Sequence, residues 1–360
     1  MQTPIFIICV CVSNIHVTCL LEIWYQTMNI YDISKAAGVS IATVSRVIND
    51  SSSVTEKTKQ KVLSVIEEYG YTPNAFARGL GLNTMQTIGI MCPDSSDPYL
   101  ADAIYYLERE LRQNNYDSIL CCTGYQLSTK EKYLKLLLSK RIDAVILIGS
   151  NFIEANDKNN KYIYDASKEV PVILLNGYLE GANIYSTSCD DYQAVNDAVS
   201  SLIQSGIHKI LYLFHSLSYS GIRKLDGYKA AMLAHNLPLK EEYMQQFSGT
   251  IHETKDFLLK LKDDGLEFDA IVTSDDSLAV SAIKYAKACN ISIPSQLSII
   301  GYNNSIMAEC CEPELTSVDN KVETLCIQSV STLMRVFANS NVPAKTMFSA
   351  DIVKRATTRF

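Results

Sequence analysis

The fold is constrained most by seven short apolar runs, which are spaced along the chain from residue 87 onward. The runs are continuously apolar rather than alternating, which predicts strands buried on both faces and therefore parallel sheets in an α/β fold. Two such sheets fit the length, and their strand ends would face each other across a cleft. The runs are TIGIMC (87–92), SILCC (118–122), AVILI (144–148), VPVILL (170–175), KILYLF (209–214), AIVT (270–273) and LSIIGY (297–302).

The segment before these runs has a different pattern. Residues 30–49, IYDISKAAGVSIATVSRVIN, predict two short helices separated by a turn at Gly38. Ser40 stands where an N-cap should open the second helix. The inward-facing residues expected on the two helices are Ile30, Ile33 and Ala37 on the first and Val44, Val47 and Ile48 on the second.

The opposite stripe of the second helix consists of small and hydrogen-bonding side chains, Ala42, Ser45, Arg46 and Asn49. Such a stripe suits a helix that enters the major groove of DNA, and Arg46 is the best candidate for a base or phosphate contact. The alternative is a helical hairpin at the surface in which Arg46 is simply solvated.

The string DISxxAGVSxATVSRVIN resembles the N-terminal signature of the lactose repressor (LacI/GalR) family of bacterial transcription regulators. The resemblance runs from about Met28 to the C-terminus. It includes a third helix within residues 51–71, where Thr55 is the expected N-cap and where Val62, Ile66 and Tyr69 are expected on one face. The segment YTPNAFARGLGLNTMQTIGIM then resembles the family's hinge and first strand.

The resemblance implies an N-terminal all-α helix-turn-helix domain and an α/β periplasmic-binding-protein-like effector domain of two Rossmann-like subdomains. We expect the helix-turn-helix domain at 28–72, a hinge helix at 73–85 and the effector-binding domain at 86–360. Within the last, the first subdomain is expected at about 86–187 and 319–343. The second is expected at about 188–318 and 344–360.

The family's contacts with DNA come from the second helix and from the hinge, where a Leu is wedged into the minor groove and kinks the duplex. Leu80 occupies that place, between Gly79 and Gly81, whose low helix propensity should make the hinge more dependent on DNA for its order. Ordinary linker packing is the alternative for Leu80. The expected DNA-binding residues are Ser40, Ile41, Ala42, Thr43, Ser45, Arg46 and Asn49 in the head, and Asn74, Ala77, Arg78 and Leu80 in the hinge.

Polar residues at the strand ends are the candidates for binding a polyhydroxylated effector. Asp276 in VTSDDSLA matches the family's effector-binding Asp, and Lys224, counted back from Gly227, stands where the family has an effector-anchoring Arg. Arg223 precedes it, so either cation could be the anchor. Asn303 stands where the family commonly has Asp. The expected effector-binding residues are Asp97, Tyr99, Ser150, Asn176, Arg223, Lys224, Asp276 and Asn303. Asp94, Ser95 and His215 also follow strand ends. The alternative for each of these residues is a polar side chain that is simply exposed to solvent near a strand end.

The composition excludes several other classes of protein. A net charge of −7 argues against nucleic-acid binding over the whole surface, so DNA contact is confined to a small part. The 11 cysteines lack the spacing of a metal site or disulfide framework. Without a phosphate-binding glycine motif or a nucleophile–base constellation, we expect no enzyme activity, cofactor or metal.

Residues 1–27 are apolar but lack the charge and cleavage pattern of a signal peptide. We interpret them as a non-native extension of the gene start, with Met28 as the initiator. The chain is expected to be a cytoplasmic repressor with operator DNA and a sugar-like effector as partners and no membrane association. We expect a homodimer because the chain ends without leucine heptads. The alternative is an exported or membrane-anchored sugar receptor with a vestigial DNA-binding head.

Overall fold

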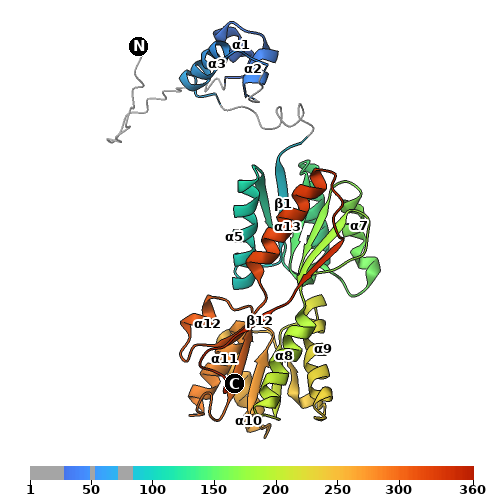
Figure 1. The fold of residues 1–360 in the computed structure, drawn as a ribbon, viewed down its shortest axis with the longest axis vertical. Coiled ribbons are helices and arrows are strands. Elements are labelled where there is room, and N and C mark those ends of the chain that lie inside the picture. The colour runs from blue at the N-terminus through green and yellow to red at the C-terminus, as the bar shows by residue number, and fades with distance from the viewer. Residues whose placement is uncertain (1–27, 49–52, 72–83) are drawn as a thin grey trace, which may run out of the picture. The chain divides into compact units, whose positions relative to one another are not determined.

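The computed structural model describes residues 28–48, 53–71 and 84–360, drawn as ribbons in Figure 1. The chain divides between residues 81 and 82 into two compact units, here called the head and the large unit. The proposed extension (1–27) and the hinge residues 73–83 lie outside the described residues. No helix of the described part is long and apolar enough to cross a membrane.

The head consists of three helices, α1 (Ile30–Ala37), α2 (Ile41–Ile48) and α3 (Glu56–Glu68). Gly38 ends α1 in the left-handed conformation, at φ 61°, and Ser40 opens α2 by accepting a hydrogen bond from the Thr43 N–H at 3.1 Å. Both turn predictions are confirmed. The core of the head is formed by Ile33, Ala37, Val44, Val47 and Val62.

Two details of α3 differ from the prediction. Thr55 is the N-cap residue, but its hydroxyl makes no capping bond to the backbone and contacts the Thr58 hydroxyl instead, at 2.9 Å. Tyr69 lies beyond the last helical residue and is exposed, whereas Val62 is buried and Ile66 packs against the core. The helix ends at Glu68, so Tyr69 does not continue the apolar face.

The large unit contains two six-stranded sheets. The first has the order β11-β5-β4-β3-β1-β2, and all its neighbouring strands are parallel. The second has the order β12-β10-β9-β8-β6-β7 and is parallel except for the β10–β12 pair. The strands are β1 (Thr87–Cys92), β2 (Asp117–Cys122), β3 (Ala144–Ile148), β4 (Val172–Leu175), β5 (Ile184–Cys189), β6 (Ile210–Phe214), β7 (Met244–Gln246), β8 (Ala270–Thr273), β9 (Ser298–Tyr302), β10 (Thr316–Asp319), β11 (Lys345–Phe348) and β12 (Asp351–Val353).

Helices cover both faces of each sheet, as continuously apolar strands require. On the first sheet, α5 and α13 pack on one face and α6 and α7 on the other. On the second sheet, α8 and α9 pack on one face and α10 and α11 on the other. The helices of the large unit are α5 (Pro98–Gln113), α6 (Leu127–Ser139), α7 (Lys161–Ser167), α8 (Asp191–Gln204), α9 (Tyr219–Ala234), α10 (Ile251–Asp263), α11 (Asp276–Ala288), α12 (Ile306–Cys310) and α13 (Val322–Phe337), with short 3-10 turns η1 (Ser150–Phe152), η2 (Asp157–Asn160) and η3 (Glu241–Tyr243).

The expected boundary between the subdomains is wrong at two places. Residues 344–360 were assigned to the second subdomain, but β11 pairs in parallel with β5 in the first sheet, from Lys345 opposite Ser186 to Phe348 opposite Cys189. Residues 188 and 189 likewise belong to β5. The chain returns to the first sheet after α13 and leaves it again only at β12.

Two glycines fix the position of α9. A side chain at Gly227 would place its Cβ 2.2 Å from the Tyr192 carbonyl oxygen, because α8 and α9 cross there in close contact. A side chain at Gly221 would place its Cβ 2.1 Å from the Ser216 carbonyl oxygen. Neither position has room for any other residue without movement of the backbone.

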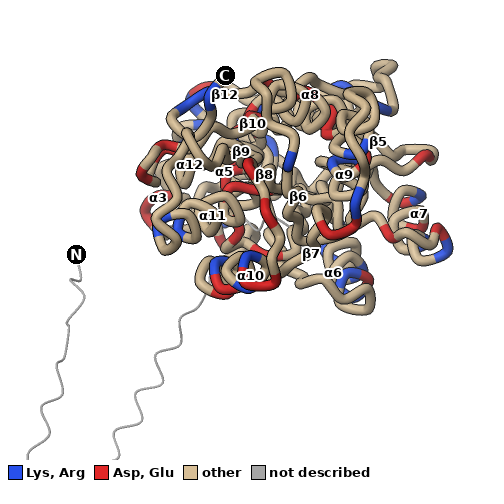
Figure 2. Tube along the Cα trace, turned by 90° about the horizontal axis from the view of Figure 1, so that it is seen from below, with Lys and Arg blue, Asp and Glu red and all other residues tan. Residues whose placement is uncertain are grey.

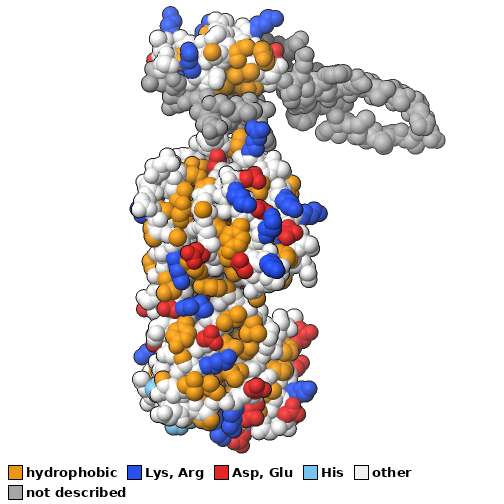
Figure 3. Space-filling model, turned by 90° about the vertical axis from the view of Figure 1, so that its right-hand side faces the viewer, with side chains coloured by type: hydrophobic (Ala, Val, Ile, Leu, Met, Phe, Trp, Pro, Cys, Tyr) orange, Lys and Arg blue, Asp and Glu red, His pale blue; other side chains and the backbone are white. Residues whose placement is uncertain are grey.

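Lys, Arg, Asp and Glu residues occur on helices of the large unit that include α6, α7 and α10 (Figure 2). On the face shown in Figure 3, the two signs are interspersed rather than gathered into one patch.

Candidate effector pocket and DNA-binding helix

The exposed face of α2 carries the side chains predicted to meet DNA. Val44 and Val47 are buried, which turns Ile41, Ala42 and Arg46 outward. Thr43 and Ser45 are half-buried beside them. The predicted orientation of the helix is therefore confirmed, whereas Asn49, Asn74, Ala77, Arg78 and Leu80 lie outside the described residues.

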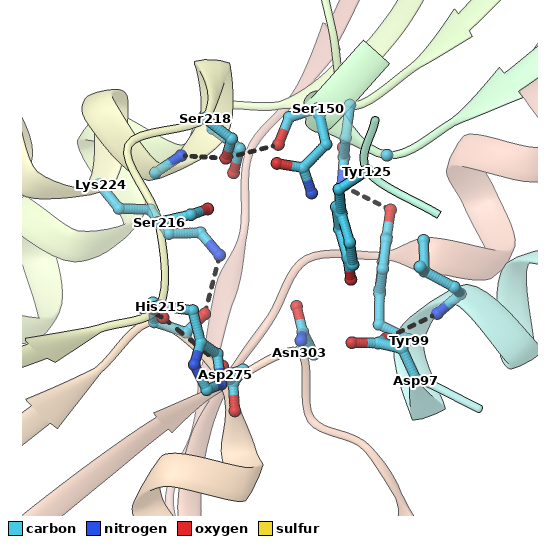
Figure 4. A pocket seen from close by; sticks show the side chains of 17 residues that line it. Asp97, Tyr99, Tyr125, Ser150, His215, Ser216, Ser218, Lys224, Asp275 and Asn303 are labelled. Atoms are coloured by element: carbon cyan, nitrogen blue, oxygen red, sulfur yellow. Dashed lines mark hydrogen bonds and ion pairs between the residues drawn. The ribbon is translucent and has the colours of Figure 1, made fainter. Parts of the chain in front are cut away.

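A pocket lies between the two sheets of the large unit, at the C-terminal ends of their strands (Figure 4). It brings together six of the eight residues predicted to bind an effector, and also His215. Its lining residues are Asp97, Tyr99, Leu100, Tyr125, Gly149, Ser150, Asn151 and Asn176 from the first subdomain, and His215, Ser216, Ser218, Ser220, Gly221, Lys224, Ser274, Asp275 and Asn303 from the second.

The first-subdomain wall presents oxygen atoms. Asp97 is the N-cap of α5 and accepts a hydrogen bond from the Leu100 N–H at 3.0 Å. The Asn176 amide nitrogen donates to the Tyr99 hydroxyl at 2.5 Å. The Asn176 Oδ1 atom is buried and has no hydrogen-bond partner among the described residues.

The second-subdomain wall is formed largely by the first turns of α9. Ser218 caps this helix and accepts a hydrogen bond from the Gly221 N–H at 3.3 Å. Lys224 is buried, donates to the Ser274 carbonyl oxygen at 2.9 Å and lies over the Tyr302 ring, 3.5 Å from its centroid. Burial lowers the pKa of Lys224, although the charges of Asp191 and Asp275 oppose this shift.

His215 and Asp275 form an ion pair at the edge of the pocket. The His215 Nε2 atom lies 2.8 Å from the Asp275 carboxylate, and its Nδ1 atom lies 3.0 Å from the Phe247 carbonyl oxygen. Burial alone would lower the pKa of His215, but the hydrogen bond and charge of Asp275 outweigh it and raise this pKa. Burial likewise opposes ionisation of Asp275, yet His215 and the Ser277 hydroxyl hold its pKa below the ordinary value.

One direct contact joins the two walls. The Ser150 hydroxyl, in η1 of the first subdomain, donates to the Ser218 hydroxyl, at the start of α9 in the second, over 2.9 Å. The pocket is thus lined by side chains that belong to both subdomains and that meet across it. A ligand held there would contact both.

Comparison with known proteins identifies both units. The family of bacterial regulatory proteins named after lacI matches residues 29–74, and the family of periplasmic binding proteins and sugar-binding domains of the LacI family matches residues 85–356. A transcriptional regulator of the helix-turn-helix type from Lachnoclostridium phytofermentans is 61% identical over 333 residues, which cover 92% of this chain and 100% of the relative. The chain belongs to the LacI family of bacterial transcriptional regulators.

Other relatives and solved structures agree with this assignment. Catabolite control protein A of Priestia megaterium is 32% identical over 81% of this chain and 87% of its own length. The lac repressor dimer bound to operator and the anti-inducer ONPF has the same fold, with a TM-score of 0.82 at 21% identity over 92% of this chain and 99% of the repressor chain. This LacI-family chain is therefore a DNA-binding transcriptional regulator that carries a sugar-binding type of domain, and the exported receptor is not favoured.

Two residues predicted to line the pocket of this LacI-family regulator do not do so. Asp276 is buried beneath it, where its carboxylate accepts hydrogen bonds from the Ser305 N–H at 2.7 Å and the Ser317 hydroxyl at 2.6 Å. Arg223 faces away and pairs with Asp190 at 3.0 Å. Asp94 and Ser95 do not appear among the lining residues either.

The pocket residues in place of these two are their sequence neighbours, Asp275 and Lys224. Asp275 is the N-cap of α11, and its carboxylate accepts from the Ser277 and Leu278 N–H groups. An N-cap after a strand end lies at the sheet's edge, whereas the first helical residue turns back over the sheet. That distinction could have identified Asp275 from the sequence. No such feature of the sequence indicated that Tyr125, Ser216 or Ser220 would line the pocket.

Proposed function

We propose that this regulator is a cytoplasmic homodimeric repressor whose operator affinity changes when a small polyhydroxylated molecule binds the pocket between its subdomains. The observation that carries the proposal is the make-up of the pocket. Its lining is mostly neutral hydrogen-bonding side chains with a few charged groups, drawn from both subdomains. Such a lining suits a ligand with many hydroxyl groups.

Binding can be coupled to DNA through the chain's own connectivity. The predicted hinge leads directly into β1, in the first subdomain, and the pocket joins that subdomain to the second. A ligand that contacts both walls favours one separation of the subdomains over another. It shifts the operator-binding equilibrium only as far as its affinities for the two states differ, about 1–3 kcal/mol in typical allosteric proteins.

The DNA-binding side of the proposal rests on the outward face of α2. Ile41 and Ala42 can contact thymine methyl groups but cannot donate side-chain hydrogen bonds, so Arg46 is the principal polar reader among the described residues. With two heads in a dimer we expect a pseudo-palindromic operator. We keep Asn49, Asn74, Ala77, Arg78 and the Leu80 wedge as proposed contacts from the resemblance to the family.

The test is operator affinity of the full chain, measured by fluorescence anisotropy with and without a panel of sugars and sugar derivatives. We expect at least one compound to change the affinity. Asn176→Ala removes the unpaired Oδ1 in the pocket and should weaken that response while leaving operator binding without ligand intact. Asn341→Ala, an exposed position outside the pocket, is the matched control. An unchanged ligand response in Asn176→Ala would place the effector elsewhere.

A further inference from the structure

The two walls of the pocket differ in the kind of polar group that they offer. The second-subdomain wall carries Lys224, and the first-subdomain wall carries the Asp97 carboxylate. Figure 4 shows Lys224 on one side of the cavity, Asp97 and Tyr99 on the other, and Asn303 between them. A ligand that spans the pocket can therefore contact a cation at one wall and a carboxylate at the other.

Lys224 is a buried cation with no carboxylate in contact. Its ammonium group has three N–H bonds, one of which goes to the Ser274 carbonyl oxygen, while the Tyr302 ring covers one side. Among the residues that the structure describes, no carboxylate lies within ion-pair distance of Lys224. A buried charge of this kind is costly unless a counterion completes its surroundings.

The nearest acid on the pocket wall is already engaged. The His215 ring contacts a carboxylate through one nitrogen and a backbone carbonyl through the other, and both of these groups can only accept hydrogen bonds. His215 must then donate from both nitrogens, so it is an imidazolium that balances Asp275. Lys224 remains as a cation that no carboxylate of the described residues contacts, since Asp97 lies on the opposite wall.

Asn303 lines the pocket, and its side-chain oxygen already accepts one hydrogen bond. The Asn320 amide nitrogen donates to the Asn303 Oδ1 atom at 3.0 Å, which leaves the Asn303 Nδ2 hydrogens without a partner among the described residues. A carboxylate at this position would accept hydrogen bonds from ligand hydroxyls, whereas the Asn303 amide donates. The start of α9, a helix of 16 residues whose N-terminal dipole is positive, lies on the same wall.

We propose that the effector is a sugar acid, a small polyhydroxylated carboxylate whose carboxylate contacts Lys224 and Asn303 and whose hydroxyl groups donate to Asp97. This inference rests on the proposed function and names the chemical class of its ligand. A carboxylate on the ligand would give Lys224 the contact with an anion that it lacks among the described residues. The second charge of a phosphate would find no further cation, and the carboxylates of Asp191 and Asp275 already act on Lys224 from beyond ion-pair distance.

Calorimetric titration of the full chain at neutral pH tests the charge requirement. The probes are D-glucuronate, D-galacturonate and D-gluconate, compared with neutral D-glucose and D-galactose and with glucose 6-phosphate. We expect at least one acid to bind about tenfold or more tightly than its neutral parent, because a hydrogen bond to a charged group contributes about that factor. A neutral sugar or the phosphate binding as tightly as the best acid overturns the proposal, and so does a failure of all three acids to bind at millimolar concentration.

Variants locate the charge that is responsible. Lys224→Met should reduce the affinity for the acid by about tenfold or more. Asn303→Asp replaces a donor with an anion and should also reject the acid, which keeps the test valid if Lys224→Met does not fold. Arg223→Met removes the adjacent cation, which faces Asp190 outside the pocket, and is the matched control. Acid affinity unchanged in both pocket variants contradicts the proposal.

The same samples separate this inference from the proposed function. If a neutral sugar binds as tightly as the best acid and changes operator affinity, the effector site stands and the sugar-acid class is wrong. If an acid binds in a manner that depends on Lys224 but operator affinity does not change, the ligand class stands and the regulatory role of the pocket is wrong.

Discussion

The outward face of α2 is made by residues within one helix of eight, whereas the pocket is assembled from residues between 97 and 303 that lie at the ends of different strands. In α2 the apolar residues that face the core fix, by spacing alone, which residues face outward. In the pocket the side chains come from several loops and helix starts. Local spacing therefore identified the outward face of α2, while Asp276 was predicted in place of its neighbour Asp275 and Arg223 was predicted beside Lys224.

The one-residue errors have a common physical cause. Consecutive residues at the start of a helix point about 100° apart, so of Arg223 and Lys224, or of Asp275 and Asp276, only one can face the cavity. Which one depends on where the strand ends and the helix begins. That boundary is the least certain feature of a sequence-based prediction, and it decides the chemistry of the site.

The largest effect that we predict is unfolding of the head by a substitution that leaves the pocket folded. Ile33→Ala leaves a cavity in a core of five buried residues, which costs about 2–5 kcal/mol and approaches the whole stability of so small a unit. Operator binding should be lost and the circular dichroism of the head helices reduced. Ligand binding measured by calorimetry should stay. Loss of both activities would show that the two units unfold together and would remove the contrast between them.

Asp276→Ala tests whether this carboxylate is structural. It would leave the buried Ser305 N–H and Ser317 hydroxyl without an acceptor, at a cost of about 3 kcal/mol in the free energy of unfolding. Urea unfolding, followed by far-ultraviolet circular dichroism, measures this change. Folded protein at low temperature should still bind ligand. If the variant has wild-type stability but no longer binds ligand, Asp276 contacts the ligand instead.

Arg46→Ala should weaken operator binding by about 1–3 kcal/mol for each half-site, because Arg46 is the exposed cation of the α2 face. The melting temperature should not change, since the side chain lies outside the core. Lys35→Ala, an exposed cation on α1, serves as the control. Full operator affinity in the Arg46 variant would mean that this face of α2 does not enter the groove.

The smallest predicted effect concerns pH. Because the pKa of His215 is raised in the folded protein, the stability that its ion pair contributes is fully present below the ordinary pKa, about 6.5, and is lost as pH rises through the raised value. In His215→Gln the melting temperature of the large unit should fall less over this interval than in the wild type. Parallel pH profiles for the two proteins would show that His215 is not charged in the folded state.

The sheets could be predicted further than the site. Each of the seven apolar runs forms a strand, and all of these strands except the edge strand β2 are almost entirely buried. β5 contains Ser186, Thr187 and Ser188, and the short strands β7, β10, β11 and β12 also contain polar residues, so no comparable apolar run marks them. The sheet to which β11 belongs depends on its pairing with β5, which the residues of β11 do not reveal.

The glycines of α9 have a consequence for how effector preference can diversify. Gly221 and Gly227 have no room for a side chain, because Gly221 lies against the Ser216 carbonyl and Gly227 against α8. The helical turn between them is therefore held in place whatever residues it carries. Substitutions at Lys224 and its pocket neighbours can then exchange one ligand chemistry for another without moving the scaffold. A selection for new inducers should retain both glycines in every functional clone while the pocket positions vary freely.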